Sequence, residues 1–352
     1  MRRSPNQGFT PKLSIRSVAS RAGVSIATVS RTINHVQTVN AVLAARVWKA
    51  ADELNYTPNS QARALVSGKS KLLGLIISEI TNPFFPELIQ EFEKVAVKQG
   101  YEILIGSTNY EPKTMEICAR RMFERQVDGV AIMTFGIEQF LLDRFASDDV
   151  PVIFIDIPSK RPRSNILSVD YRAGIWEGVQ HLAKLGHRKL AFISGPLQHC
   201  SAGARKAAFL DCIRDAGIKP NQNWLIEGDH TLEGGRDAMK KILALPKRPT
   251  AIMCSNDMTA IGVQHALFDA NLKIPGDFSL IGFDDIHLAE YTIPPLTTVQ
   301  MSCKDLAQAA ITSLLSRLQP QEGKVKREEP ITTRLVVRRT TGPPKVSERP
   351  GA

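Results

Sequence analysis

The pattern of apolar and polar residues changes once along the 352-residue chain, near residue 71. Before this point, Ser14 and Ser25 each stand between apolar residues at the spacing of a helix cap with its hydrophobic staple. Helices are therefore expected from Ile15 and over 26–34. After Asn40, apolar residues recur at i, i+4, i+7, i+8 and i+11, which predicts a third helix. Two short helices joined by a turn and closed by a third are typical of a helix-turn-helix domain.

After residue 71 the apolar residues come in short runs rich in β-branched side chains, separated by amphipathic stretches. This alternation predicts an α/β fold with parallel, doubly wound sheets. The expected strands are 72–78, 101–107, 128–134, 151–157, 189–195, 224–229, 250–256 and 278–285. Four of them precede the segment 166–170 and four follow it, so two Rossmann-like lobes are expected. Residues 297–301 should cross back to the first lobe, where a helix over 303–318 and a last strand complete the lobes.

Positive charge is concentrated in the helical part. Residues 1–71 contain 11 Lys and Arg against two acidic residues, a net charge of +9, whereas the other 281 residues carry +1. This distribution indicates a head that binds a polyanion on a nearly neutral body, although a solvated basic arm would show the same charge. In the second helix, Val29 and Ile33 should face the core. The residues then left for a DNA major groove are Ser25, Ile26, Ala27, Thr28, Ser30 and Arg31.

Polar side chains follow several expected strands at their carboxyl ends, where doubly wound sheets bind ligands. Two carboxylates, an arginine and an amide suit a hydroxyl-rich ligand held between two lobes, so the expected ligand is a carbohydrate. The candidate residues are Asn82, Phe84, Thr134, Asp156, Ser201, Arg205, His230, Asn256 and Asp284. Helix capping by Asn256 and a turn at Asp284 are the structural alternatives.

Missing motifs disfavour several classes of protein. The chain has no G-x-S-x-G, H-E-x-x-H or G-x-G-x-x-G sequence, and SGKS at 67–70 lacks the first glycine of a phosphate-binding loop. Five scattered cysteines without a C-x-x-C pair indicate neither disulfides nor zinc, so no cofactor or metal is expected. Without a bilayer-spanning run or a signal peptide, a cytoplasmic protein with no membrane partner is expected. The alternatives to a DNA-binding protein are a solute-binding protein and a sugar-processing enzyme of similar fold.

The segments AGVSIATVSRTIN and LNYTPNSQARALVSGKS resemble the DNA-binding head and hinge of the lactose-repressor (LacI/GalR) family. The resemblance continues through SEITNPFF, GHRKLAFISGP, GARKAAF, CSNDMTAIGV, IPGDFSLIGFDD and PPLTTV, which look like landmarks of the family's periplasmic-binding-protein-like (type I) effector domain. It spans about residues 13–341. The expected organisation is a disordered leader (1–12), a helix-turn-helix domain (13–57), a hinge (58–71), an effector-binding and dimerisation domain (72–341) and a flexible tail (342–352). Lobe 1 should comprise 72–168 and 300–330, and lobe 2 should comprise 169–299 and 331–341.

The resemblance implies a transcriptional regulator, expected to be a repressor, that binds a near-palindromic operator as a homodimer and responds to a small effector. By position, Ile26 and Ala27 match base contacts and Arg31 matches a contact to a base edge or a phosphate. Contacts to the DNA backbone are implied for Ser25, Thr28, Ser30 and Asn34. A hinge helix that enters the minor groove is implied for Asn59, Ala62 and Leu65, of which Leu65 matches the leucine that wedges open the central base step.

In the effector domain, the resemblance carries over to the cleft. The family's effector-contacting polar set is matched by Asp156, Arg205, Asn256 and Asp284, and its cleft wall by Ser201 and His230. His230 stands where some relatives stack an aromatic ring on the ligand, which disfavours a purine and leaves the identity of the sugar open. The Pro-rich end of the chain contains no leucine heptads, so a dimer is expected rather than a tetramer.

Overall fold

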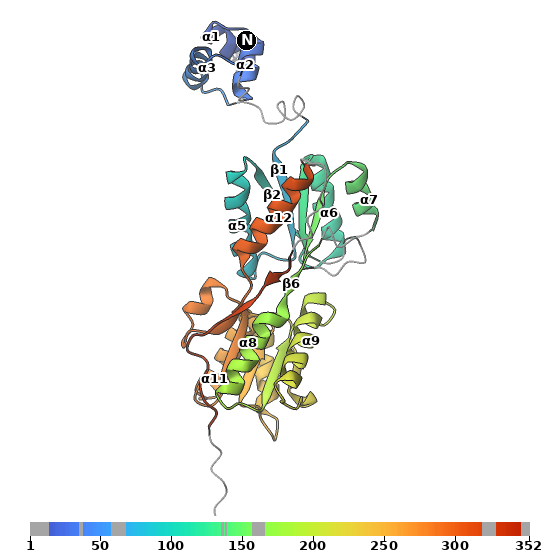
Figure 1. Cartoon of the computed structure of the whole chain (residues 1–352), viewed down its shortest axis with the longest axis vertical. Coiled ribbons are helices and arrows are strands. Elements are labelled where there is room, and N and C mark those ends of the chain that lie inside the picture. Colours follow the sequence, from blue (N-terminus) through green and yellow to red (C-terminus); the bar gives the residue numbers. More distant parts are fainter. Residues whose placement is uncertain are drawn as a thin grey trace, which may run out of the picture. The chain divides into compact units, whose positions relative to one another are not determined.

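The computed structural model describes residues 14–34, 38–57, 68–134, 137, 139–156, 166–318 and 329–345. It forms two compact units, 1–70 and 71–352, drawn in Figure 1. Several predictions lie outside the described residues: the leader over 1–12, and the hinge residues Asn59, Ala62 and Leu65.

The first unit contains the three predicted helices, α1 (Ile15–Ala22), α2 (Ile26–Ile33) and α3 (Ala41–Glu53). Ser14 is the N-cap of α1, and the hydroxyl of Ser25 accepts a hydrogen bond from a backbone N–H in the first turn of α2. Val18, Val29 and Val47 come from one helix each and are completely buried in a shared core. The helix-turn-helix prediction is confirmed.

The second unit begins with a five-stranded parallel sheet in the order β2-β1-β3-β4-β5. Its strands are β1 (Leu72–Ile77), β2 (Glu102–Ser107), β3 (Gly129–Met133), β4 (Val152–Ile155) and β5 (Ile166–Leu167). One face is covered by α5 (Phe84–Lys98) and α12 (Cys303–Leu318), the other by α6 (Pro112–Glu124) and α7 (Gln139–Ser147) (Figure 1). We call this sheet with its four helices the first lobe.

The second lobe is built on a six-stranded sheet in the order β13-β11-β10-β9-β7-β8. Its strands are β7 (Leu190–Ser194), β8 (Leu225–Glu227), β9 (Ala251–Cys254), β10 (Ser279–Asp284), β11 (Thr297–Gln300) and β13 (Arg334–Val336). Its helices are α8 (Tyr171–Lys184), α9 (Cys200–Asp215), α10 (Leu232–Leu243) and α11 (Asp257–Asp269), with the short 3-10 helices η2 (Gln222–Trp224) and η3 (His287–Glu290). The doubly wound α/β prediction is confirmed, except that β13 runs antiparallel to β11. As an edge strand it needs no right-handed crossover, so the returning chain can pair in this direction.

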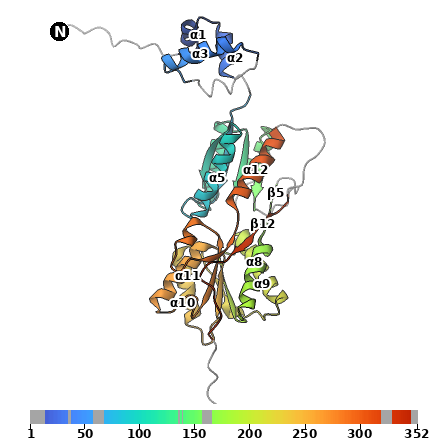
Figure 2. The same cartoon turned by 60° about the vertical axis from the view of Figure 1, so that its left-hand side comes forward.

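The described elements pass from the first lobe to the second after β5, back to the first lobe at α12, and again to the second lobe at β12 (Ile331–Thr332) and β13. β5 ends the first sheet, and after Ser168 the strand β6 (Val169–Asp170) pairs with β12 next to the second lobe (Figure 2). The return crossing lies between β11 and α12. No helix in the described part of the chain is long and apolar enough to cross a membrane.

The flexible tail was expected to start at residue 342, and this is wrong for residues 342–345. The hydroxyl of Ser279 donates a hydrogen bond to the carbonyl of Gly342 at 2.9 Å, and Lys345 forms an ion pair with Asp277. The Pro-rich composition suggested a loose end, but these contacts hold the segment on the second lobe.

Two glycines allow α10 and α11 to cross closely. A Cβ atom added to Gly235 would lie 2.1 Å from a backbone oxygen of α11, and one added to Gly262 would lie 2.0 Å from a backbone oxygen of α10. The two helices begin just after His230 and Asn256. The contact between the helices therefore helps to fix both candidate site residues.

Gly262→Ala should lower the free energy of unfolding by roughly 1–3 kcal/mol, because the methyl group forces two packed backbones apart. Gly203→Ala in α9 is the matched control, since its added Cβ meets nothing within 4 Å. The control should gain about 0.5–1 kcal/mol from helix propensity. Urea unfolding of both variants measures these changes. An unchanged free energy of unfolding in Gly262→Ala would show that α10 and α11 are not closely packed at this position.

Candidate functional site

The outer face of α2 carries the side chains predicted to contact bases. Ile26 is a large apolar side chain that is nevertheless 46% exposed, and Ala27 and Arg31 on the same helix are also exposed. Val29 and Ile33 point into the core, as expected. An exposed isoleucine and an exposed arginine on one short helix suit a DNA groove, where apolar and guanidinium contacts to base edges combine.

The residues predicted to contact the DNA backbone are placed less uniformly. The hydroxyl of Ser25 accepts from the N–H of Thr28 at 3.1 Å and shares a second hydrogen bond with the Thr28 hydroxyl at 2.9 Å. Ser30 is half-buried, whereas Asn34 is exposed at the C-cap of α2. The contacts of these four residues with DNA stay a prediction.

A cavity lies between the two lobes, at the carboxyl ends of the strands, and contains about 540 Å³ of space, part of it open to solvent. It brings together eight of the nine predicted ligand-site residues: Asn82, Phe84, Asp156, Ser201, Arg205, His230, Asn256 and Asp284. Thr134 is the exception. It is 1% exposed, and its hydroxyl shares a hydrogen bond with that of Thr108 at 2.9 Å. Thr134 therefore supports the cavity wall from behind and does not line it.

Arg205 holds a buried charge at the centre of the site. Its Nη1 donates to the carbonyl oxygen of Ser255 at 2.6 Å and lies 3.4 Å from the Asp284 carboxylate. Its guanidinium also faces the rings of Tyr171 and Phe283, at 4.9 and 4.1 Å from their centroids. Within the described part of the chain, its buried Nε has no hydrogen-bond partner. Arg205 lies in the second turn of α9, so the free N–H groups expected beside it belong to the preceding turn.

The two cavity carboxylates have raised pKa values. Burial raises the pKa of Asp156 to about 6 and that of Asp284 to about 7, although the charge of Arg205 lowers both. Asp156 also accepts a hydrogen bond from the hydroxyl of Tyr171, at the start of α8. Both aspartates have left-handed backbone conformations, with φ of 58° and 112°. Such strain persists at functional sites only where the surrounding structure enforces it.

His230 and Asn256 form the part of the wall that was expected to recognise the ligand through a ring and an amide. His230 Nε2 lies 2.7 Å from the Ser255 hydroxyl, and burial lowers the pKa of its imidazole to about 3, so the ring is neutral. Gly195 leaves room for this ring, since a Cβ there would lie 2.0 Å from it. Asn256 caps α11 by accepting from the N–H of Thr259, and its amide donates to the His230 carbonyl. One N–H and one lone pair of Asn256 are left for a ligand.

Sequence reasoning missed the rings of Tyr110 and His199, which also line the cavity. They come from different lobes and stack with their centroids 4.4 Å apart and their planes 12° apart. The Tyr110 hydroxyl donates to Glu79 at 3.3 Å. Tyr110 follows β2 in a turn, so the carboxyl-end criterion that found the other residues would also have found it. His199 gives no such signal, because a histidine before a helix is usually a surface residue.

An exposed reading helix on one unit and a polar ligand cavity on the other define an effector-responsive DNA-binding regulator. Residues 14–59 match the model of bacterial regulatory proteins of the lacI family, and residues 179–341 match a periplasmic binding protein-like domain. The HTH-type transcriptional repressor PurR of Photobacterium profundum is 33% identical over 327 residues, which cover 93% of this chain and 98% of the relative. The chain belongs to the LacI family of bacterial regulatory proteins.

Solved structures agree with this assignment. The Lac repressor dimer bound to operator and the anti-inducer ONPF has a TM-score of 0.82 and 28% identity, covering 94% of this chain and 99% of that chain. A LacI family regulator from Enterococcus faecium with bound ribose has a TM-score of 0.69 and 27% identity, covering 78% of this chain and all of that one. The protein is therefore a DNA-binding transcriptional repressor with a small-molecule effector. Both the PurR relative and the Lac repressor are transcriptional repressors.

Asp284→Asn should change how the stability of the effector domain depends on pH. The folded-state pKa of about 7 exceeds the ordinary value of 3.8, so between these values the folded protein holds a proton that the unfolded chain has released. The wild-type free energy of unfolding therefore falls as pH rises through this window, and an amide has no such decline. The urea midpoint of the variant, relative to that of the wild type, should therefore be higher at about pH 8 than at about pH 5. Parallel pH profiles would contradict the buried position of this carboxylate.

Proposed function

We propose that the effector of this repressor is a carbohydrate that contacts both lobes at once. The observation that carries the proposal is the placement of Arg205 and Asp284 in the second lobe, opposite Asp156 in the first, around one cavity. Carboxylates accept hydrogen bonds from sugar hydroxyls, and a guanidinium donates to ring and hydroxyl oxygens. The aromatic side chains of Phe84 and Tyr110 line the same cavity and offer flat faces for the C–H groups of a sugar ring. The E. faecium relative with bound ribose supports this ligand class.

Such a ligand acts by differential affinity for the arrangements of the lobes. A molecule that bridges two lobes binds one interlobe angle better than another, and only this difference can shift the equilibrium. The first lobe leads into the hinge through β1, so its position bears on whether the hinge residues order on DNA. Ordering coupled to binding would add selectivity for the correct operator.

On the DNA side, we propose that Ile26 and Ala27 contact base edges and that Arg31 contacts a guanine or a phosphate. The contacts of Asn59, Ala62 and Leu65 in the minor groove are proposed from the resemblance alone. The repressor is proposed to act in the cytoplasm as a homodimer on a near-palindromic operator, as the Lac repressor dimer structure supports. A two-fold protein requires two half-sites in opposite orientation.

A thermal-shift screen of the full chain against sugars, sugar acids and nucleobases tests the ligand class. A ligand at 100 times its dissociation constant adds about 2.7 kcal/mol of stability, which is easily measured. A sugar should raise the melting temperature of the protein. If only a nucleobase does so, the effector is not a carbohydrate.

Arg205→Ala should weaken binding of the sugar found in this screen by tenfold or more, because a charged hydrogen-bonding partner typically contributes about 1.5–3 kcal/mol. Arg214→Ala is the matched control, since this arginine lies on the same helix with its side chain 63% exposed. Calorimetry on both variants measures the effect. Equal affinities in wild type and Arg205→Ala would remove Arg205 from the ligand site.

Arg31→Ala should cost roughly 1–3 kcal/mol of operator affinity and relax specificity at one position if the side chain reads a guanine. A phosphate contact would instead lower affinity uniformly across sequences and reduce the salt slope by about one. Gel shifts at several salt concentrations separate the two roles, with the exposed Lys219→Ala of the effector domain as the charge-matched control. Unaltered operator binding in Arg31→Ala would contradict the assignment of α2 as the recognition helix.

A further inference from the structure

A hydrogen bond joins the first lobe to the turn that follows the ligand-site strand β10. The backbone N–H of His287 donates to Oε1 of Glu87 at 2.8 Å. Glu87 lies in the first turn of α5 in the first lobe, whereas His287 begins η3 in the second lobe. Only two residues separate His287 from Asp284, which lines the cavity. The hydrogen bond therefore connects the first lobe to a backbone position of the second lobe that is close in the chain to the ligand site.

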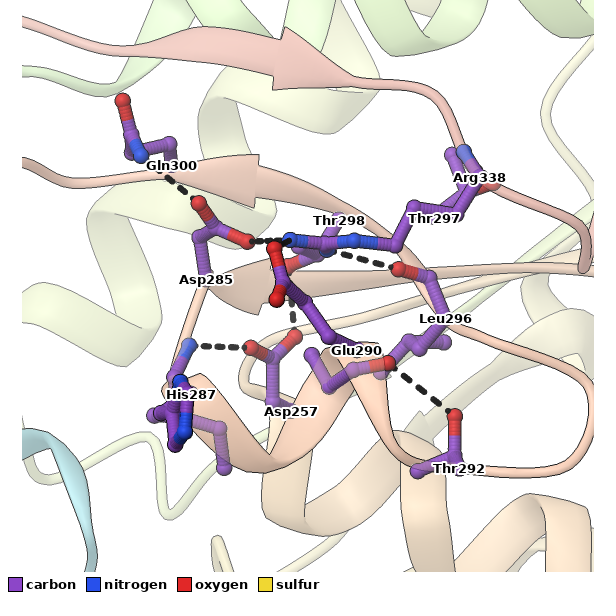
Figure 3. Close-up of polar contacts among 12 residues, drawn as sticks. Asp257, Asp285, His287, Glu290, Thr292, Leu296, Thr297, Thr298, Gln300 and Arg338 are labelled. Carbon is purple, nitrogen blue, oxygen red and sulfur yellow. Dashed lines mark hydrogen bonds and ion pairs between the residues drawn. The ribbon is translucent and has the colours of Figure 1, made fainter.

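The turn itself is fixed to the second lobe by buried polar contacts, drawn in Figure 3. Asp257 accepts from the N–H of Ile286 at 2.9 Å and from the hydroxyl of Thr298 at 2.5 Å. Asp285 accepts from Arg338 at 2.7 Å and has a left-handed backbone with φ of 61°. Displacing this turn would break several hydrogen bonds at once. We therefore expect Asp284, Asp285 and the N–H of His287 to move as one rigid segment.

The helix that carries Glu87 also forms part of the cavity wall. Phe84 and Phe85, at the start of α5, are 4% and 7% exposed and line the cavity. Glu87 follows them within the same helical turn, and burial raises the pKa of its carboxyl while the hydrogen bond from His287 lowers it. A shift of this helix end would alter the aromatic wall and the hydrogen bond to His287 in one step.

We propose that Glu87 is a positioning residue that holds the first lobe on the turn presenting Asp284, through its hydrogen bond to the His287 N–H. The angle between the lobes and the position of the Asp284 carboxylate are then set together. A ligand that shifts Asp284 also displaces the N–H of His287, which donates its hydrogen bond to Glu87. The shift is thereby transmitted to α5 in the first lobe. The link from Glu87 to ligand affinity rests on the proposed function, because it takes Asp284 as an effector contact.

Two conservative substitutions separate the hydrogen bond from the charge. Glu87→Gln keeps an acceptor oxygen at the same reach but loses the charge, whereas Glu87→Asp keeps the charge but is one methylene too short. Glu87 also lies near the N-terminus of α5, where any negative charge favours the helix. If Glu87 only stabilised the helix, Glu87→Asp would therefore behave like the wild type and Glu87→Gln would behave like Glu87→Ala. The positioning role predicts the opposite pairing.

Hydrogen–deuterium exchange on the full chain, without DNA or added ligand, measures the effect. In Glu87→Asp and Glu87→Ala, amides of residues 285–291 in the second lobe and of 82–88 in the first should exchange at least fivefold faster. Glu87→Gln should exchange like the wild type. Glu93→Ala is the matched control, since it removes the same charge from an exposed position of the same helix and should change nothing.

Two results would overturn the proposal. One is unchanged exchange of residues 285–291 in both Glu87→Asp and Glu87→Ala, which would show that the hydrogen bond does not hold the turn. The other is accelerated exchange in Glu87→Gln with a wild-type profile in Glu87→Asp, which would assign the effect to charge. Neither result bears on whether the effector is a sugar, because no ligand is present, so this proposal and the proposed function fail separately.

Discussion

The guanidinium of Arg205 imposes the strictest physical constraint on the effector domain, because a full positive charge is held with the residue 6% exposed. Removing a charge from water costs several kcal/mol unless close partners compensate for it. Here the compensation comes from the Asp284 carboxylate, the carbonyl of Ser255 and two aromatic faces. Among the described residues, its buried Nε has no hydrogen-bond partner. A site with this much desolvated charge distinguishes ligands by whether they complete its hydrogen bonds.

Several contacts between the two lobes lie around the same cavity. Tyr171 faces Arg205 from the second lobe, and its hydroxyl donates to Asp156 in the first. The stack of Tyr110 on His199 and the hydrogen bond from His287 to Glu87 also pass between the lobes. Each of these contacts includes a residue of the cavity wall or one close to it in the chain. Occupancy of the cavity and the angle between the lobes are therefore coupled through short paths.

Much of this arrangement can be predicted from the sequence. Serine caps and apolar spacing place the three head helices, and the rule that ligands bind at strand carboxyl ends finds eight residues of the cavity wall. The rule fails for Thr134, because periodicity cannot show that its hydroxyl bonds to Thr108 behind the wall. Periodicity also cannot reveal the contacts of Glu87 and Tyr171. Their hydrogen-bond partners lie 200 and 15 residues away in the chain, and these contacts depend on how the two lobes come together. Side chains that act across two lobes are fixed by tertiary geometry rather than by local pattern.

A ligand in this cavity and an operator on the head control one equilibrium. Linkage requires that the factor by which saturating effector changes the operator dissociation constant equals the factor by which operator changes the effector dissociation constant. The direct measurement is a pair of titrations on the full chain, effector binding with and without operator DNA, and operator binding with and without effector. We expect two equal factors that differ from one. Two factors of one would contradict it, because the cavity would then bind its ligand without reference to DNA.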